Sequence, residues 1–502
     1  MSLLPTQPLD KKQAWLVAGF LLLLSYFTVV HGFWNPPALF WDENYHIASA
    51  QKYLNGVFFM EPHPPLGKMM VALGEKLLHL NDADNQFINT DYAKDPPPGF
   101  SFAGYRLFPV LLAWLSVPIL FAIFLLITRS SLWSMLLSFL YVFDNALIVH
   151  LRSAMLESTL LFFILLTILS FLLLLERKGQ PRAFTRASLL FGVAFGGVMA
   201  TKLNGLILLL LLPSLLVALW PRWKQWLRFL WIAGIGCAVV YIGVWWLHFS
   251  IASTVNSQLP DDGYYQASPQ YKQLLMEGKT SSLFAFPTML RDSEKFVGHY
   301  EQGVPRLDLC KADENGSPFF FWPLGARTIN YRWETPDGYN YRYLYLQVNP
   351  VVWLAGLAGL FLSILLLLGP VFLPVSQKPK SHLLIVTFLV LYLGYMVAMS
   401  RLERVMYLYH YFVPLLFTFI LLALVVVELE RFAKWHLTQE RKTSILLLLS
   451  TLIFLGFQFY RPLTYYEPIT DAAFKRRMIF QLWDLKCVHC ETNSMLVIPR
   501  AS

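Results

Sequence analysis

Long apolar runs, separated by short polar connections, dominate this chain of 502 residues. A helix needs about 20 apolar residues to cross the hydrocarbon core of a bilayer, so continuous runs of that length indicate membrane-spanning helices. The pattern predicts eleven spans, at residues 13–31, 104–128, 131–149, 154–175, 187–202, 204–220, 227–248, 350–374, 382–400, 408–428 and 443–460. The two spans around Lys202 are short, and merging them would reduce the count to ten.

A different periodicity follows the first span. In "EPHPPLGKMMVALGEKLLHL", residues 61–80, apolar side chains recur at helical spacing while charged side chains fill other positions. This pattern predicts an amphipathic helix that lies in the membrane interface, where it can cover a cavity, and the preceding prolines suit its first turn. Residues 249–349 are instead rich in turn-forming and aromatic residues, and they predict one compact region outside the membrane.

Composition and charge support this organisation. The chain is 56% hydrophobic and only 14% charged, which is typical of a membrane protein. Its net charge of +9 does not indicate a nucleic-acid partner, because Lys and Arg gather in alternate connections between spans. One set of connections holds sixteen of these cations and the short connections of the other set hold four. The N-terminus is therefore expected in the cytoplasm, with residues 32–103, 249–349 and the C-terminal tail outside.

The same pattern divides the chain into four parts. They are an N-terminal membrane module of about seven spans (1–248), an outer region (249–349), a four-span membrane module (350–460) and an outer tail (461–502). The first span is too long for a removed signal peptide and lacks its cleavage site, so we expect it to remain as an anchor. "CVHC", residues 487–490, either closes a local disulfide or pairs one cysteine with Cys310.

Polar and ionisable side chains collect toward one face of the membrane. Burying an unpartnered charge in a membrane is costly, so each of them is a candidate for function. They lie at the outer ends of the predicted spans and are Asp42, Glu43, Arg106, Asp144, Arg152, Glu157, Lys202, Arg401, Arg404, Tyr407, Tyr409 and His410. A cavity at the outer surface explains this distribution. The alternative, that they are interfacial anchors as Arg and Tyr often are, explains Asp144 and Glu157 poorly.

Two motifs are specific in combination. "WDENYH", which contains the adjacent carboxylates Asp42 and Glu43, is followed about 20 residues later by "HPPLGK" at 63–68. The later blocks are Arg106, "FDNALIVHLRSAMLESTLLFF" (143–163), "TKLNG" (201–205), "FWPLGARTINY" (321–331), "NPVVWLAG" (349–356) and "YHY" (409–411). Over most of its length the chain thus resembles the protein O-mannosyltransferases, membrane enzymes of the glycosyltransferase C (GT-C) class.

Two departures from that family pattern are visible. The family usually has an aspartate where this chain has Glu157. Its eukaryotic members also carry a beta-trefoil module in the long outer segment, and residues 249–349 are too few to hold one together with the flanking motifs. We therefore expect a bacterial-type member without the module.

The resemblance implies an all-α polytopic membrane protein with the GT-C fold. It also implies transfer of mannose, with inversion, from a polyprenyl-phosphate-mannose donor such as dolichyl phosphate mannose to Ser or Thr hydroxyls of exported polypeptides. The expected location is the inner membrane of a bacterium with the site on the periplasmic side, or the endoplasmic reticulum membrane with a lumenal site in a eukaryote. The partners are then the lipid donor, the polypeptide acceptor and membrane lipid, with no nucleic acid.

This chemistry requires a base for the attacking hydroxyl and groups that stabilise the departing phosphate. The resemblance and the chemistry favour Asp42 as the base and Glu43 as the residue that orients the acceptor or a nearby cation, with an exchange of roles left open. The candidates for binding the donor phosphate or sugar are Arg106, Lys202, Arg327, Arg404, Tyr409 and His410. The candidates for a supporting network are His63, Lys68, Asp144, Arg152 and Glu157. The last three either belong to the site or form an ion-pair network that fixes the helices.

Three alternatives remain at this point. No cofactor is expected, but His63 with Asp42, Glu43 or His46 could hold Mg²⁺ or Mn²⁺, which prefer oxygen-rich sites. A GT-C enzyme with a lipid or glycan acceptor would share the acidic pair and the topology. A polyprenyl-lipid transporter or flippase would instead place polar groups near the membrane midplane and show repeated halves, which this sequence lacks.

Overall fold

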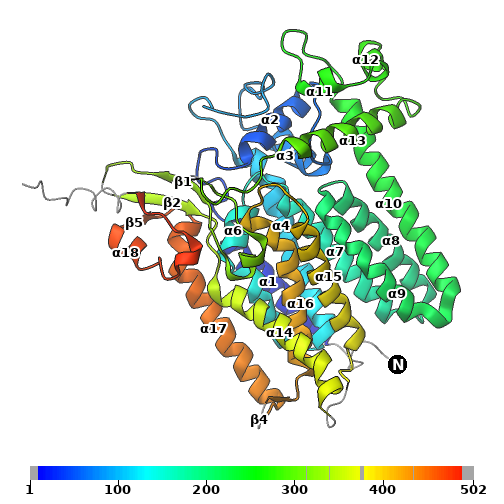
Figure 1. Ribbon diagram of the computed structural model, residues 1–502, viewed down its shortest axis with the longest axis vertical. Coiled ribbons are helices and arrows are strands. Elements are labelled where there is room, and N and C mark those ends of the chain that lie inside the picture. The colour runs from blue at the N-terminus through cyan, green and yellow to red at the C-terminus, as the bar shows by residue number, and fades with distance from the viewer. Residues whose placement is uncertain (1–9, 312–313, 339, 374–377, 433–434, 489–502) are drawn as a thin grey trace, which may run out of the picture.

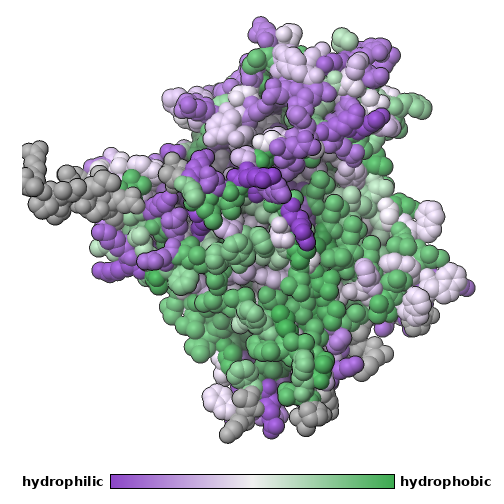
Figure 2. Space-filling view, in the orientation of Figure 1, coloured by the Kyte–Doolittle hydropathy of each residue, from purple (hydrophilic) through white to green (hydrophobic). Residues whose placement is uncertain are grey.

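The computed structural model describes residues 10–488, apart from 312–313, 339, 374–377 and 433–434. Its main body is a bundle of apolar helices, seen as a broad hydrophobic band between hydrophilic ends in Figure 2. The helices of the bundle are α1 (Lys11–Ser25), α4 (Ala103–Thr128), α5 (Ser131–Val142), α6 (Asn145–Leu151), α7 (Glu157–Glu176), α8 (Pro181–Met199), α9 (Leu211–Leu219), α10 (Trp223–Ile251), α14 (Pro350–Phe372), α15 (His382–Ser400), α16 (Phe412–Glu428) and α17 (Gln439–Thr464). A π-helical turn, η1 (Tyr26–Val30), extends α1.

Several of these helices have the length of a membrane span. Within the described ranges, eight are long and apolar enough to cross a membrane, or nine if α5 and α6 count as one span. A shorter apolar stretch joins the 3₁₀ helix η2 (Leu203–Leu210) to α9. The chain is therefore a multi-pass membrane protein with helical spans.

One predicted span is not straight. Residues 131–149 were expected to form a single helix, but α5 and α6 meet at a bend of 63°. Asp144 has an extended backbone there, and its side chain accepts a hydrogen bond from the Leu147 N–H. This N-cap starts a new helix and so accounts for the bend.

Helix α16 lies at the centre of the bundle. It is buried along nearly its whole length, and it packs against α4, α14 and α15. By contrast, only six of the 29 residues of α10 are buried, and this helix packs on α8. A short 3₁₀ helix, η5 (Leu408–Tyr411), leads directly into α16, so the buried central helix fixes the position of the "YHY" side chains.

The segments expected outside the membrane lie together at one end of the bundle (Figure 1). They include α2 (Glu43–Leu54), α3 (Leu66–Leu78), α11 (Asp262–Gln266), α12 (Pro269–Met276) and α13 (Phe286–Gly303). The remaining 3₁₀ helices come from different parts of the chain. They are η3 (Trp220–Arg222), between α9 and α10, η4 (Phe319–Leu324), before β1, and η6 (Gln481–Trp483), after α18. The polar connection between α16 and α17, with strands β3 (Arg431–Phe432) and β4 (Trp435–His436), lies at the opposite end.

Helix α3 packs closely on α4. At Gly74, an added Cβ would come within 2.2 Å of the Gly104 carbonyl oxygen, so the two backbones meet without intervening side chains. Leu66, Val71 and Ala72 of α3 are buried. The helix predicted within residues 61–80 is therefore present as α3, and it is held against the helix that carries Arg106.

A small antiparallel sheet connects the outer region with the tail. Strand β2 (Tyr341–Tyr345) pairs with β1 (Asn330–Glu334) on one side and with β5 (Pro468–Ile469) on the other. Tyr341 of β2 lies opposite Ile469 of β5. The pairing of β1 with β2 has an irregularity between Asn330 and Arg332. A short helix, α18 (Asp471–Lys475), follows β5. Two of the four predicted parts thus share one sheet, and the division into four parts stays a prediction.

One of the two disulfide pairings predicted for the tail cysteines is excluded. Cys310 is free and exposed, so the predicted pairing of a tail cysteine with Cys310 is wrong. Cys487 is disulfide-bonded, and Cys490 lies outside the described residues.

Candidate active site

Asp42 lies at the start of α2, directly after the loop that leaves the first span. Its backbone carbonyl accepts the first helical hydrogen bonds, from the Tyr45 and His46 N–H groups, but its side chain caps no backbone group. The carboxylate Oδ2 accepts a hydrogen bond of 3.1 Å from the Tyr409 hydroxyl. No described residue donates a hydrogen bond to Oδ1 of this half-buried side chain. One oxygen of Asp42 is therefore available to a substrate.

The electrostatic surroundings of Asp42 combine burial with nearby charges. Burial raises the pKa of its carboxyl group above the usual value, while the Lys202 ammonium has the largest opposing effect. The Glu157 carboxylate adds to the rise, and His150 and Tyr409 oppose it. A carboxylate with a raised pKa is a stronger proton acceptor, which suits a general base.

Lys202, Glu157 and His150 form a buried cluster beside Asp42. The Lys202 ammonium lies 2.5 Å from Glu157 Oε1, and His150 Nε2 lies 2.9 Å from Glu157 Oε2. His150 Nδ1 is 2.6 Å from the Tyr331 hydroxyl, so a tautomer protonated at Nε2 can donate to Glu157 and accept from Tyr331. These contacts hold Lys202 in place with a single described acceptor, Glu157.

Tyr409 connects this cluster to Asp42. Its ring stacks on His150 with centroids 4.8 Å apart, and the Lys202 ammonium lies 5.8 Å from the centre of the same ring. The sequence motifs contained His150 and Tyr331, but sequence reasoning did not select either. The available signal was their place within the "FDNALIVHLRS" and "FWPLGARTINY" blocks.

Glu43 is adjacent to Asp42 but has a different environment. Its fully buried carboxylate accepts two hydrogen bonds from Arg106, at 2.7 Å from Nε and 2.8 Å from Nη2, and one of 2.9 Å from the Ala154 N–H. Arg106 also donates to the backbone carbonyls of Trp34, Pro36 and Ala38. Glu43 thus orients a nearby cation, which is one of the two roles predicted for it.

The geometry corrects the prediction that Arg106 binds the donor phosphate. A guanidinium has five N–H groups, and all five donate to Glu43 or to the carbonyls of the loop before Asp42. The side chain is also fully buried between Phe40 and Phe102. No N–H of Arg106 is left for a phosphate, so this arginine fixes the loop.

Of the two alternatives predicted for Asp144, Arg152 and Glu157, the ion-pair network is not observed, because no two of the three pair with each other in the described part of the chain. Asp144 accepts hydrogen bonds from Trp353 and from backbone N–H groups instead. Arg152 donates to the His31 carbonyl and lies over the Tyr465 ring. Each of the three side chains meets different partners, and only Glu157 reaches the Asp42 surroundings.

The other predicted phosphate ligands lie around the edge of this cluster. Arg404 is half-buried and pairs with both carboxylate oxygens of Glu301, each at 2.6 Å. Arg327 donates to the Glu314 carbonyl at 2.6 Å, and its Nε is buried without a partner among the described residues. His410 stacks on Tyr409, with ring centroids 4.7 Å apart. Of these residues, His410 is the one in direct contact with the Asp42 cluster.

Lys68 belongs to the first turn of α3, and His63 lies in the loop before that helix. Lys68 is buried and pairs with Glu61, and its ammonium lies 3.2 Å from the Ser49 hydroxyl. Burial, followed by the charges of Lys202 and Lys68, lowers the pKa of His63 well below its usual value. Among the described residues, no three His, Cys, Asp or Glu side chains cluster as a metal site, and metal dependence stays untested.

Comparisons with known proteins match this arrangement. A family model described as "Dolichyl-phosphate-mannose-protein mannosyltransferase" matches residues 19–259, and one described as "C-terminal four TMM region of protein-O-mannosyltransferase" matches residues 294–483. In the structure of the S. cerevisiae protein O-mannosyltransferase Pmt1-Pmt2 complex bound to the sugar donor, one chain is similar with a TM-score of 0.78. The identity is 15%, over 98% of this chain and 96% of that one. At that identity the likeness shows the shared GT-C fold.

Sequence relatives give shorter matches. Protein O-mannosyl-transferase 1 of Danio rerio is 33% identical over 150 residues, which is 30% of this chain and 20% of the relative. Protein O-mannosyltransferase 1 of Drosophila melanogaster is 30% identical over 246 residues, 46% of this chain and 27% of the relative. The matched segments span about a fifth to a quarter of the length of these curated relatives.

Proposed function

Because the chain belongs to the dolichyl-phosphate-mannose-protein mannosyltransferase family, we propose that it transfers mannose from a polyprenyl-phosphate-mannose lipid to Ser or Thr hydroxyls of polypeptides. The reaction inverts the configuration at the sugar carbon. The hydroxyl oxygen forms a bond to that carbon while the bond from the carbon to the phosphate oxygen breaks. The hydroxyl proton passes to the enzyme, and the lipid phosphate leaves.

The chain crosses the membrane eleven times in this proposal. The crossings are those of the long apolar helices, the bent α5–α6 pair, α8 and the η2–α9 stretch. The distribution of Lys and Arg favours a cytoplasmic N-terminus, so Asp42 faces the outer or periplasmic side of a bacterial inner membrane. Helix α3 lies in the interface on that side, with Leu77 and Leu78, and Leu80 just beyond its end, exposed toward lipid.

Asp42 is the general base in this proposal, and the observation that supports it most directly is its free Oδ1. The neighbouring carboxylate of Glu43 has both oxygens engaged by Arg106, which leaves Asp42 as the proton acceptor of the pair. Tyr409 holds the other oxygen of Asp42 and so fixes the direction of the free one.

Lys202 stabilises the charge that develops on the departing phosphate. Its ammonium has three N–H groups and one described acceptor, so two are available to phosphate oxygens. Glu157 and His150 hold the ammonium beside Asp42. His410 and Tyr409 contact the sugar, and Arg404 and Arg327 attract the anionic lipid from the edge of the site. Cationic side chains supply the needed stabilisation, so we expect no metal requirement.

Release of polyprenyl phosphate tests this function. Purified protein is given polyprenyl-phosphate mannose with a Ser/Thr-rich peptide, with a glycan or lipid acceptor, or with neither, and the mannosylated products are measured. We expect mannosyl-peptide and an equal amount of free lipid phosphate, unaffected by chelators. Turnover only with the glycan or lipid acceptor would contradict the polypeptide acceptor. Restoration of a chelated enzyme by Mg²⁺ or Mn²⁺ alone would contradict the metal-free chemistry.

A further inference from the structure

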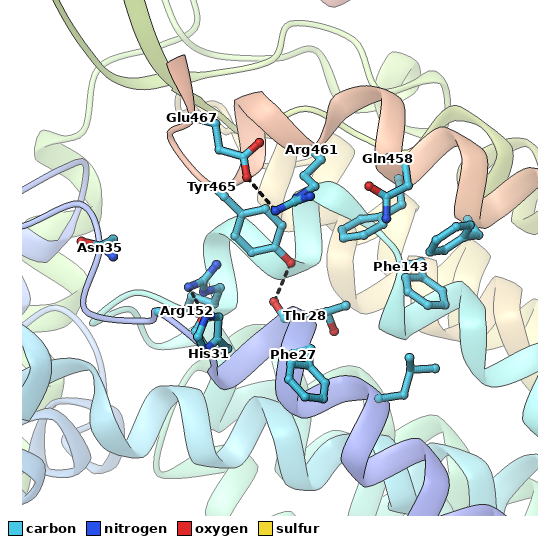
Figure 3. Close-up of a pocket in the computed structure, with 14 residues that line it drawn as sticks. Phe27, Thr28, His31, Asn35, Phe143, Arg152, Gln458, Arg461, Tyr465 and Glu467 are labelled. Carbon is cyan, nitrogen blue, oxygen red and sulfur yellow. Dashed lines mark hydrogen bonds and ion pairs between the residues drawn. The ribbon is translucent and has the colours of Figure 1, made fainter. Parts of the chain in front are cut away.

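A cavity lies between the first span and α17, and none of the Asp42 cluster lines it. Its volume is about 460 Å³, and it is lined on one side by the apolar side chains of Leu24, Phe27, Phe143, Phe454 and Phe457 (Figure 3). Phe27 and Phe454 are also exposed on the outside of the bundle, so this side of the cavity adjoins the lipid. The Tyr465 hydroxyl donates to the Thr28 carbonyl and links the two helices beside the cavity.

The other side of the cavity is polar and cationic. Arg152, Arg461 and His31 line it: Arg461 is in the last turn of α17, and Arg152 and His31 directly follow α6 and η1. Arg461 is paired with Glu467 at 2.9 Å. Arg152 is only 7% exposed and has no carboxylate partner in the described part of the chain. Its contacts are the His31 carbonyl and the Tyr465 ring, and its Nε has no hydrogen-bond partner among the described residues.

A buried guanidinium without a counter-ion needs an anion. Burying a charge is costly unless it is paired and hydrogen-bonded, and the planar guanidinium matches phosphate oxygens in particular. The cavity joins this unpaired cation to an apolar wall, two residues of which, Phe27 and Phe454, are also exposed on the outside of the bundle. An ion in water does not need such a wall, whereas a lipid headgroup with its chain does.

We propose that this cavity binds a membrane phospholipid, with its anionic phosphate at Arg152 and its acyl chain along the phenylalanine side chains. The lipid is a component of the bilayer and is distinct from the sugar donor. Its site is separate from Asp42, so the inference does not depend on the proposed transferase function.

The bound lipid also braces the site. Arg152 lies in the short connection between α6 and α7, between His150, which contacts Glu157, and Ala154, whose N–H donates to Glu43. Arg152 also holds the His31 carbonyl, near the start of the loop whose carbonyls receive Arg106. A phosphate on Arg152 therefore fixes both the α6–α7 connection and the loop before Asp42.

Lipid retention measured by native mass spectrometry tests the proposal. The full chain is purified in detergent and titrated with phosphatidylglycerol, phosphatidylcholine, polyprenyl phosphate or inorganic phosphate. Three variants are compared: Arg152→Gln removes the cation, Gln458→Trp narrows the cavity from an exposed lining position, and Arg476→Gln is a control at an exposed arginine of the same outer side. The Gln458 variant keeps the test valid if Arg152→Gln does not fold.

We expect the wild type and Arg476→Gln to retain phosphatidylglycerol in preference to phosphatidylcholine. Arg152→Gln and Gln458→Trp should weaken that binding about tenfold or more, as the loss of a charge-assisted hydrogen bond or of the cavity requires. Undiminished binding to folded Gln458→Trp would overturn the proposal. Displacement of phosphatidylglycerol by inorganic phosphate would show an ion site, and equal competition by polyprenyl phosphate would show a second carrier site; either would overturn the phospholipid assignment.

Discussion

Asp42 and Glu43 are neighbours in the chain but belong to two regions with opposite hydrogen bonding. Around Glu43, every donor of Arg106 and both carboxylate oxygens have partners, and the pair is fully buried. Around Asp42, one carboxylate oxygen has no described donor, and Lys202 has one described acceptor for three N–H groups. The hydrogen bonds around Glu43 are therefore complete without a substrate, whereas those around Asp42 and Lys202 are not.

The difference arises from local geometry. Successive side chains on a helix point about 100° apart, so two adjacent acids at the start of α2 face different neighbours. Glu43 points toward α4 and the α6–α7 connection, whereas Asp42 points toward Tyr409 at the entry to α16. A motif of two carboxylates can therefore combine one structural anchor with one reactive group. Saturation of the hydrogen bonds distinguishes the two roles.

Asp42→Asn gives the sharpest test of this comparison. It removes the proton acceptor and keeps the shape of the side chain, so we expect mannosyl transfer to fall by about 10²–10⁴-fold. Thermal unfolding in detergent should change little, because Oδ1 has no described partner to lose. A variant with near-normal turnover would exclude Asp42 as the base.

Glu43→Gln should have the opposite signature. Removing one charge of a buried pair leaves the Arg106 guanidinium without its counter-ion, which costs about 3–5 kcal/mol. We expect a clear fall in the unfolding midpoint and loss of the loop that carries Asp42. Glu43→Gln combined with Arg106→Met removes both charges and should recover part of the midpoint. A folded Glu43→Gln protein with unchanged midpoint and lost turnover would assign Glu43 the chemical role instead.

The sequence alone predicted much of the fold, because long apolar runs and the bias of Lys and Arg are visible without three-dimensional contacts. Helix α3 and the long apolar helices occur close to their expected positions. The bend at Asp144 was missed, because an aspartate within an apolar run looks like a buried polar residue until its bond to the Leu147 N–H is seen. The sheet of β1, β2 and β5 was missed as well, because β5, which pairs with β2, is far away in the chain.

The candidate site was only partly predictable. Motif order pointed to Asp42, Lys202 and Tyr409, which the structure brings together from three distant segments. The sequence did not reveal that all five N–H groups of Arg106 have acceptors, because three of them donate to backbone carbonyls, and the other two share the single carboxylate of Glu43. His150 and Tyr331 were overlooked for a related reason: His150 contacts Glu157 and Tyr331 contacts His150, and the spacing of the motifs does not encode these contacts.

Lys202→Gln tests whether the free N–H groups of Lys202 bind the phosphate of the lipid donor. A hydrogen bond to a charged group contributes about 1.5–3 kcal/mol, so we expect kcat/KM for the lipid donor to fall by roughly 10–100-fold. Lys202→Arg should retain part of the activity. Because Lys202→Gln also leaves Glu157 without its cation, the double variant with Glu157→Gln controls for folding. If Lys202→Gln instead raised KM for the peptide and left KM for the lipid donor unchanged, Lys202 would lie at the acceptor.

Tyr409→Phe should give the smallest effect and the most specific one. Burial raises the pKa of Asp42, and the hydrogen bond from the Tyr409 hydroxyl opposes that rise. The base works when it is deprotonated, so kcat/KM should fall as the pH drops through a pKa above the usual aspartate value.

Removing the Tyr409 hydroxyl takes away one stabiliser of the carboxylate and should raise that pKa further. The acid limb of the pH profile should therefore move to higher pH, while the rate on the plateau falls only a few-fold. Tyr45→Phe is the matched control, because Tyr45 is an exposed tyrosine of α2 whose hydroxyl does not bond to Asp42. An acid limb that stays in place, or that moves to lower pH, would mean that the group seen in the profile is not Asp42. Glu43, whose carboxylate oxygens all have hydrogen-bond partners, would then have to be reconsidered as the reactive carboxylate.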